Sequence, residues 1–139
     1  MTKYSFNMEK VLEYRSNVEK TKVEDYAKIN ILLSSEKEHL DNLETEYKSN
    51  TQKKASSVTE MKMNLMYRDK LKNQLSSQQK KIDEISTRLE DARGDLIEAR
   101  KDRKIMEKLK EKNREKYDAD VASREQKELD DISIMKYAK

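Results

Sequence analysis

The first half of the chain carries apolar residues at alternating steps of three and four. This repeat covers residues 26–47 and has one polar position, Glu36. Its apolar members are Tyr26, Ile29, Leu33, Leu40, Leu43 and Tyr47. A heptad repeat of this kind lines one face of an α-helix and pairs it with another helix. Such regularity argues against both a β fold and a disordered chain.

A second repeat with the same spacing covers residues 71–99, and its polar position is Gln78. Its other members are Leu71, Leu75, Ile82, Ile85, Leu89, Ala92, Leu96 and Ala99. The polar stretch between the repeats reads as a loop, and Ser57 and Glu60 have the spacing of a capping box at the start of a new helix. We predict a first helix over about 6–50, a loop over about 48–57, and a second helix over about 57–137.

Composition supports helices throughout. Charged residues make up 42% of the 139 residues, proline is absent, and Gly94 is the single glycine, placed on the outer face of the second repeat. Two amphipathic helices joined by a short loop fold back on each other. The expected fold is therefore all-α, an antiparallel two-helix coiled coil with a longer second helix, forming one domain over residues 1–139.

The two repeats also indicate a register for this hairpin. Pairing residues whose numbers sum to about 115 places Leu33 opposite Ile82, and it places the polar positions Glu36 and Gln78 opposite each other. In this register the amino-terminal end of the first helix, near Asn7, lies opposite about residue 108. Roughly 30 residues of the second helix, on the order of 45 Å at 1.5 Å per residue, would extend past it.

The sequence predicts no catalytic or metal site. Cysteine is absent and His39 is the single histidine, whereas nucleophilic triads and zinc sites need several such residues. A phosphate-binding loop needs several glycines. We expect no enzymatic activity, no catalytic residue, no metal and no cofactor.

Charge and hydropathy bound the location and the partners. The net charge is only +3, which gives weak general attraction to nucleic acid or anionic lipid. The amino-terminal residues lack the apolar run of a secretory signal, and no stretch approaches the 18 apolar residues of a membrane span. We expect a cytoplasmic protein that does not insert directly into a membrane.

Three stretches depart from a plain coiled coil. Met61, Met63 and Met66 gather near Tyr47 and Tyr67, where they either cap the hairpin core or form an adaptable surface. Residues 100–116 hold nine basic and four acidic residues, which is either a solvated face or a docking surface for an acidic partner.

The third stretch is the carboxyl-terminal one. Residues 118–131 hold six acids and two bases, so the charge reverses there. Leu129 at the end of this stretch, and Ile132 and Met135 beyond it, follow at steps of three on one helix face. This apolar face is predicted to bury in a partner, and the alternative is an end that packs on the first helix.

Four segments make the chain resemble the FliJ family, soluble coiled-coil components of the bacterial flagellar protein export apparatus. They are "FNMEKVLEYR", "NVEK", "EYKSN" and the ending "KELDDISIMKY". The resemblance implies a non-enzymatic antiparallel coiled coil similar to the central stalk of rotary ATPases. It implies three partners: the flagellar export ATPase ring, the export gate membrane protein and export chaperones. It also implies peripheral recruitment to the cytoplasmic membrane at the flagellar base.

The resemblance further implies two binding surfaces. The ATPase-binding residues would be Phe6, Arg15, Arg114, Tyr117, Arg124, Leu129, Ile132 and Met135. The residues that bind the export gate would be Leu43, Tyr47, Met61, Met66, Tyr67 and Leu71. Leu43 and Leu71 also belong to the heptad repeats, and one side chain cannot be both buried and available. Two other functions stay open: a stalk of a virulence-type secretion ATPase, and a coiled coil that binds nucleic acid through residues 100–116.

Overall fold

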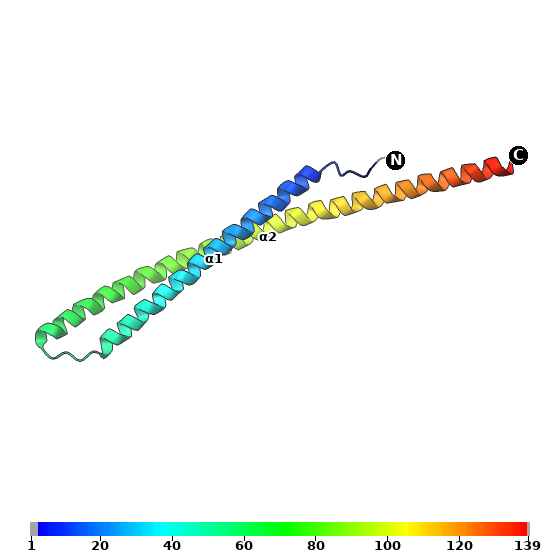
Figure 1. The fold of residues 1–139 in the computed structure, drawn as a ribbon. Helices are drawn as coiled ribbons and strands as arrows, with labels where there is room; N and C mark the ends of the chain where they lie inside the picture. Colours follow the sequence, from blue (N-terminus) through cyan, green and yellow to red (C-terminus); the bar gives the residue numbers. More distant parts are fainter. Residues whose placement is uncertain (1–2, 139) are drawn as a thin grey trace. The chain divides into compact units, whose positions relative to one another are not determined.

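The computed structural model describes residues 3–138, and the regular elements in this part of the chain are two α-helices. Helix α1 covers Glu9–Gln52 and helix α2 covers Val58–Tyr137 (Figure 1). The predicted all-α fold with a longer second helix is confirmed. The first helix begins three residues later than predicted, and the loop is shorter, at residues 53–57.

Local hydrogen bonds set both helix starts. The backbone N–H of Leu12 donates to the carbonyl of Met8 at 3.0 Å, which begins α1. At the start of α2 the backbone N–H of Glu60 donates to the hydroxyl of Ser57 at 3.1 Å, as the capping-box spacing predicts. The return bond differs from the motif, because the Glu60 carboxylate accepts from the backbone N–H of Ser56 at 3.1 Å and also from its hydroxyl. These bonds lower the pKa of Glu60, the Ser56 hydroxyl most.

The chain divides into two compact units, Met1–Lys20 with Ile97–Lys139, and Thr21–Leu96. We call the first the terminal unit and the second the loop unit. Each contains a stretch of both helices. The expectation that the chain forms one coiled-coil domain stays a prediction.

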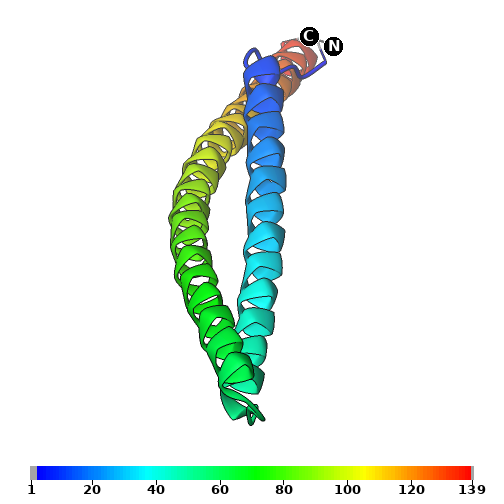
Figure 2. The ribbon, with the colours of Figure 1, turned by 90° about the vertical axis from the view of Figure 1, so that its left-hand side faces the viewer.

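The loop unit is held together by the two heptad repeats. Its core is a cluster of Leu33, Ile82 and Ile85, and these pack against half-buried neighbours, Ile29, Leu40 and Leu89. Figures 1 and 2 both show this stretch of α1 beside the green stretch of α2, and the chain direction reverses at the loop. The predicted facing of Leu33 and Ile82 is confirmed by their packing in one cluster.

The polar positions of the two repeats form a bonded layer in the loop unit. Gln78 is buried, and its side-chain amide donates to the backbone carbonyl of Glu36 at 2.9 Å and to the Glu36 carboxylate. The carboxylate also pairs with Lys81 at 3.0 Å. The predicted facing of Glu36 and Gln78 is confirmed. A satisfied polar pair in an apolar seam favours one register, because a shifted register leaves these groups buried without partners.

This polar layer predicts a pH dependence of stability. The hydrogen bond from Gln78, followed by the contact with Lys81, lowers the pKa of Glu36 from its ordinary 4.5. A lowered pKa in the folded state means that the ionised carboxylate stabilises the fold above the unfolded value, and that this contribution is lost as the pH falls through the folded value. We expect urea titrations to show wild type losing more stability than Glu36→Gln between about pH 6 and about pH 3, around the ordinary glutamate range. Parallel pH profiles for the two proteins would contradict the assignment.

Gly94 lies on an exposed turn of α2 in the loop unit. A Cβ atom built on it meets nothing within 4 Å, so alanine has room there. We expect Gly94→Ala to stabilise the protein by up to about 1 kcal/mol, because glycine is the poorer helix former by that amount. Thermal unfolding followed by circular dichroism measures the change. Ala27→Gly, at an exposed position of α1, is the matched control and should lower stability by a similar amount.

The terminal unit has a thinner core and more ion pairs. Leu12, Ala99 and Met106 are its buried apolar residues among those described. Several ion pairs join its two helical stretches: Arg15 with Asp102 at 3.3 Å, Lys110 with Glu9 at 2.8 Å, Arg100 with Glu19 at 3.4 Å, and Arg103 with Glu19. The Arg15–Asp102 and Lys110–Glu9 pairs are well exposed, so each is worth little by itself. Glu19 is mostly covered and accepts from both Arg100 and Arg103. In this unit charge pairing therefore accompanies the few apolar contacts.

Candidate partner-binding surfaces

The carboxyl-terminal end of α2 presents an apolar stripe to solvent. Every described residue from Ala122 onward is exposed. Leu129, Ile132 and Met135 are 58%, 61% and 71% exposed and share one helix face, because their steps of three keep them within about a third of a turn. The alternative that this end packs on the first helix is wrong. A face of this composition is suited to burial in a partner groove.

A cluster of aromatic and cationic side chains lies where this exposed stretch begins. The Tyr4 hydroxyl donates to Asn113 Oδ1 at 3.2 Å, and the Tyr4 and Tyr117 rings lie 5.2 Å apart between centroids. The Arg114 guanidinium sits 4.5 Å from the Tyr4 ring centroid and pairs with Asp118 at 3.3 Å. The segment before α1 is thereby fastened to α2.

Six of the predicted ATPase-binding residues lie at or beyond this cluster, all in the terminal unit: Arg114, Tyr117, Arg124, Leu129, Ile132 and Met135. Phe6 is half-buried and lines an open groove that Arg114 also lines. Arg15 lies further along α1 in its ion pair with Asp102. Sequence reasoning missed Tyr4, because it precedes the helix and stands outside any heptad pattern.

The loop end of α2 exposes its methionines. Met61, Met63 and Met66 are 54%, 65% and 69% exposed, so the alternative that they cap the hairpin core is wrong. Tyr67 is partly exposed, and its hydroxyl donates to Glu46 at 3.2 Å. That hydrogen bond raises the pKa of Tyr67, because the neighbouring carboxylate disfavours the phenolate. The loop unit thus offers a flexible apolar surface with one oriented tyrosine.

Two residues predicted to bind the export gate are interior residues in this fold. Leu71 is 1% exposed and Leu43 is 8% exposed, because both occupy core positions of the heptad repeats. Tyr47 is half-buried. Met61, Met66 and Tyr67 are the members of that set with side chains available at the surface of the closed hairpin.

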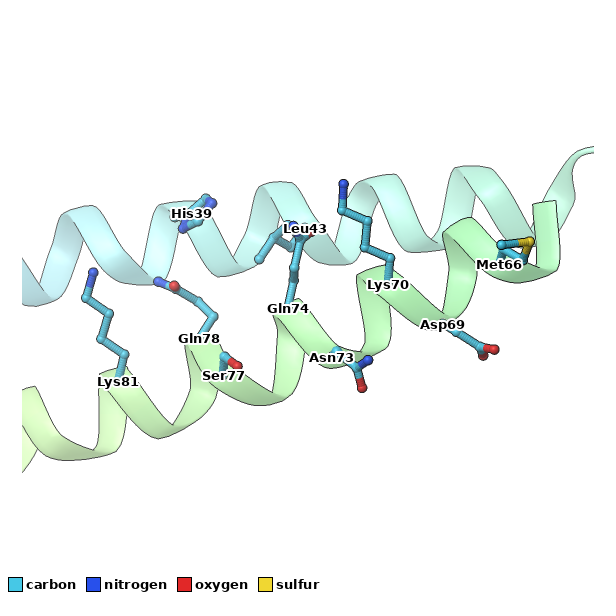
Figure 3. A pocket seen from close by; sticks show the side chains of 10 residues that line it. All are labelled: His39, Leu43, Met66, Asp69, Lys70, Asn73, Gln74, Ser77, Gln78 and Lys81. Carbon is cyan, nitrogen blue, oxygen red and sulfur yellow. The ribbon is translucent and has the colours of Figure 1, made fainter. Parts of the chain in front are cut away.

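A groove runs beside these residues between α1 and α2 in the loop unit. Its volume is about 840 Å³, and α1 contributes His39 and Leu43 to its lining while α2 contributes the remainder. Gln78 and Lys81 extend toward α1, whereas Asp69 and Asn73 point away from it (Figure 3). The remaining lining residues are Met66, Lys70, Gln74 and Ser77. Amide and hydroxyl residues beside the second repeat, such as Asn73, Gln74 and Ser77, line this groove. The sequence analysis did not use this polar run.

The described residues contain no group of three or more histidine, cysteine, aspartate or glutamate side chains placed to hold a metal ion. Neither described helix combines the length and the apolar content that a membrane crossing requires. The features described above are exposed surfaces suited to binding other macromolecules.

Comparison with known proteins agrees with this picture. A model of a family described as the flagellar FliJ protein matches residues 4–139. No curated protein and no solved structure matched the chain. Because the family model covers the chain almost from end to end, the protein belongs to the flagellar FliJ family and is a component of the flagellar export apparatus.

Proposed function

We propose that the protein is a non-enzymatic stalk and adaptor of the flagellar export apparatus. In this proposal the terminal unit binds the export ATPase ring and promotes its assembly or activity. The loop unit binds the export gate membrane protein, and the protein also contacts export chaperones. Binding to the gate would recruit it peripherally to the cytoplasmic membrane.

The observation that carries the proposal is the apolar stripe of Leu129, Ile132 and Met135 on an exposed helix end. Burying three such side chains in a partner yields roughly 25 cal/mol per Å² of apolar area removed from water. These side chains contribute no such free energy while they stay in solvent. Burial in the groove of a partner explains why they lie together on an exposed face. Because the chain belongs to an export family, the export ATPase is the best-supported partner with such a groove.

The decisive test uses the purified export ATPase. Full-length protein is expected to raise its rate of ATP hydrolysis, and a protein lacking residues 129–139 is expected to lose most of that effect. Circular dichroism should show that the remaining residues keep their helical content, because the described residues of the removed segment, 129–138, are exposed. Undiminished stimulation by the truncated protein would sink this assignment of the terminal unit.

The role of the loop unit has a separate test. We expect Met61→Ser combined with Met66→Ser to weaken binding to the soluble domain of the gate protein while leaving ATPase stimulation unchanged. Both side chains are exposed, so the fold should tolerate the change. Met63→Ser, at a similarly exposed position, tests whether the effect belongs to those two residues.

Nucleic-acid binding through residues 100–116 is less well supported. Arg100, Arg103 and Lys110 pair with acids of α1 in the terminal unit. Lys101 and Arg114 pair with Glu98 and Asp118 of α2, so five of the nine basic residues already have partners within the fold. Binding through the remaining residues would weaken steeply with salt. Absence of DNA retention at low salt would exclude this function.

A further inference from the structure

The basic residues of 100–116 divide between two sides of α2. Arg100, Arg103 and Lys110 face α1, where they pair with Glu19 and Glu9. Their charges are balanced within the terminal unit. These residues are therefore not available to a partner without breaking contacts of the fold.

The other lysines of this stretch form a separate, outward surface. Lys104, Lys108 and Lys112 follow at steps of four, are exposed, and form no ion pair with any described residue. Ile105 and Leu109 lie beside them on the same face and are 62% and 44% exposed. We call these five residues the basic face. Glu111 and Glu115 are also exposed on this side of the helix, so the three lysines outnumber the acids by one. The excess positive charge and the two exposed apolar side chains are suited to a partner that is both apolar and acidic.

Such a surface exists further along the same helix. Glu125 and Glu128 lie at helical spacing among Leu129, Ile132 and Met135, and all five are exposed. We call these residues the acidic stripe. Because it places two carboxylates next to three apolar side chains, it complements the basic face in both charge and hydropathy.

One molecule cannot bring these two surfaces together. Both belong to α2, where they follow one another along an uninterrupted helix, from its yellow to its red stretch in Figure 1. A continuous helix of this kind does not fold back on itself. The partner with complementary surfaces is therefore a second copy of the chain.

We propose that the acidic stripe of one molecule docks on the basic face of another. The two surfaces point in different directions from α2, roughly 150° apart at about 100° per residue. The contact is thus head to tail, and it leaves one free surface of each kind at the ends of an assembly. The fraction of associated molecules should rise with protein concentration, and the assemblies should be short linear oligomers. It buries the stripe that the proposed function gives to the ATPase, so self-association and ATPase binding exclude each other.

Sedimentation velocity on the full chain tests this without any partner protein. At low ionic strength, about 0.05 M, where exposed charges are screened least, the wild type should associate as its concentration rises from micromolar to millimolar. Two variants are expected to weaken this by about tenfold or more, since like charges then face each other. The basic-face variant is Lys104→Glu with Lys108→Glu and Lys112→Glu. The acidic-stripe variant is Glu125→Lys with Glu128→Lys.

Mixing supplies the most specific outcome. The two variants together should associate, because the reversed stripe of one complements the reversed face of the other. A control with three reversals on exposed lysines of the loop unit, Lys37→Glu, Lys62→Glu and Lys72→Glu, should associate like the wild type.

Three results would overturn the proposal. They are a wild type that stays monomeric throughout, association that neither variant weakens, and variants that fail to associate when mixed. A monomeric wild type whose basic face binds heparin would instead assign that face to an external polyanion. None of these results bears on ATPase stimulation, so the proposed function stands or falls separately.

Discussion

Leu129→Ser combined with Ile132→Ser is expected to abolish stimulation of the export ATPase. Both side chains are more than half exposed on the acidic stripe, so the substitutions remove apolar area that only a bound partner would bury. Loss of two large aliphatic side chains from an interface costs about 3–6 kcal/mol of binding free energy, which weakens affinity by two orders of magnitude or more. ATP hydrolysis measured over a range of protein concentrations gives the effect.

Ile134→Ser provides the matched control for that experiment. Ile134 has an exposure similar to that of Ile132, 66% against 61%. Two residues along a helix correspond to a rotation of about 200°, so Ile134 lies on the opposite side. Stimulation should be close to normal in this variant. Equal loss in Ile132→Ser and Ile134→Ser would show that general hydrophobicity matters and that the stripe does not.

Leu71→Ala is expected to produce the largest loss of stability. Leu71 is 1% exposed, the most buried of the large apolar side chains in the described chain. Truncating a buried leucine removes its transfer free energy and leaves a cavity, with a typical loss of 2–5 kcal/mol. A two-helix core can partly close such a cavity, so we expect about 2–3 kcal/mol. Urea unfolding followed by circular dichroism measures it.

The control for Leu71 is Leu65→Ala, also on α2 in the loop unit but 50% exposed. Its loss should stay below about 1 kcal/mol, as for other surface substitutions. This pair of variants also separates two roles of the loop unit. If Leu71→Ala weakens binding to the gate protein only in proportion to the unfolded fraction, Leu71 acts through the fold alone.

The heptad repeats explain why the fold was predictable. A seam repeated over many turns specifies a helix and its buried face, and one polar residue in each seam aligns the two helices. In the structure, the hydrogen bond from Gln78 to Glu36 connects these two polar positions. Helix ends were less predictable, because they depend on single hydrogen bonds such as the one from Leu12 to Met8.

The candidate surfaces were only partly predictable. The stripe at Leu129, Ile132 and Met135 has helical spacing that the sequence displays directly. The hydrogen bond from Tyr4 to Asn113 joins residues more than a hundred positions apart in the sequence. No local sequence pattern predicts such a contact. Heptad position correctly marked Leu71 as a core residue, although the family resemblance had placed it on a binding surface.

The division of the basic residues has the same explanation. A count of charges in residues 100–116 treats all cations as equal. In the fold the guanidinium groups of Arg100 and Arg103 reach the Glu19 carboxylate, whereas the lysines at steps of four face solvent. The position of each residue around α2, relative to the buried Ala99 and Met106, and the acids on α1 together distinguish the two groups.

The short loop at residues 53–57 also acts as a tether. A linker this short keeps the two heptad seams at an effective local concentration in the millimolar range. Cleavage there, for instance by trypsin after Lys53 or Lys54, would turn an intramolecular association into a bimolecular one. The melting temperature of the nicked protein would then depend on its dilution, whereas that of the intact chain would not. The tether thus allows a narrow, highly charged pair of helices to stay closed at low protein concentration.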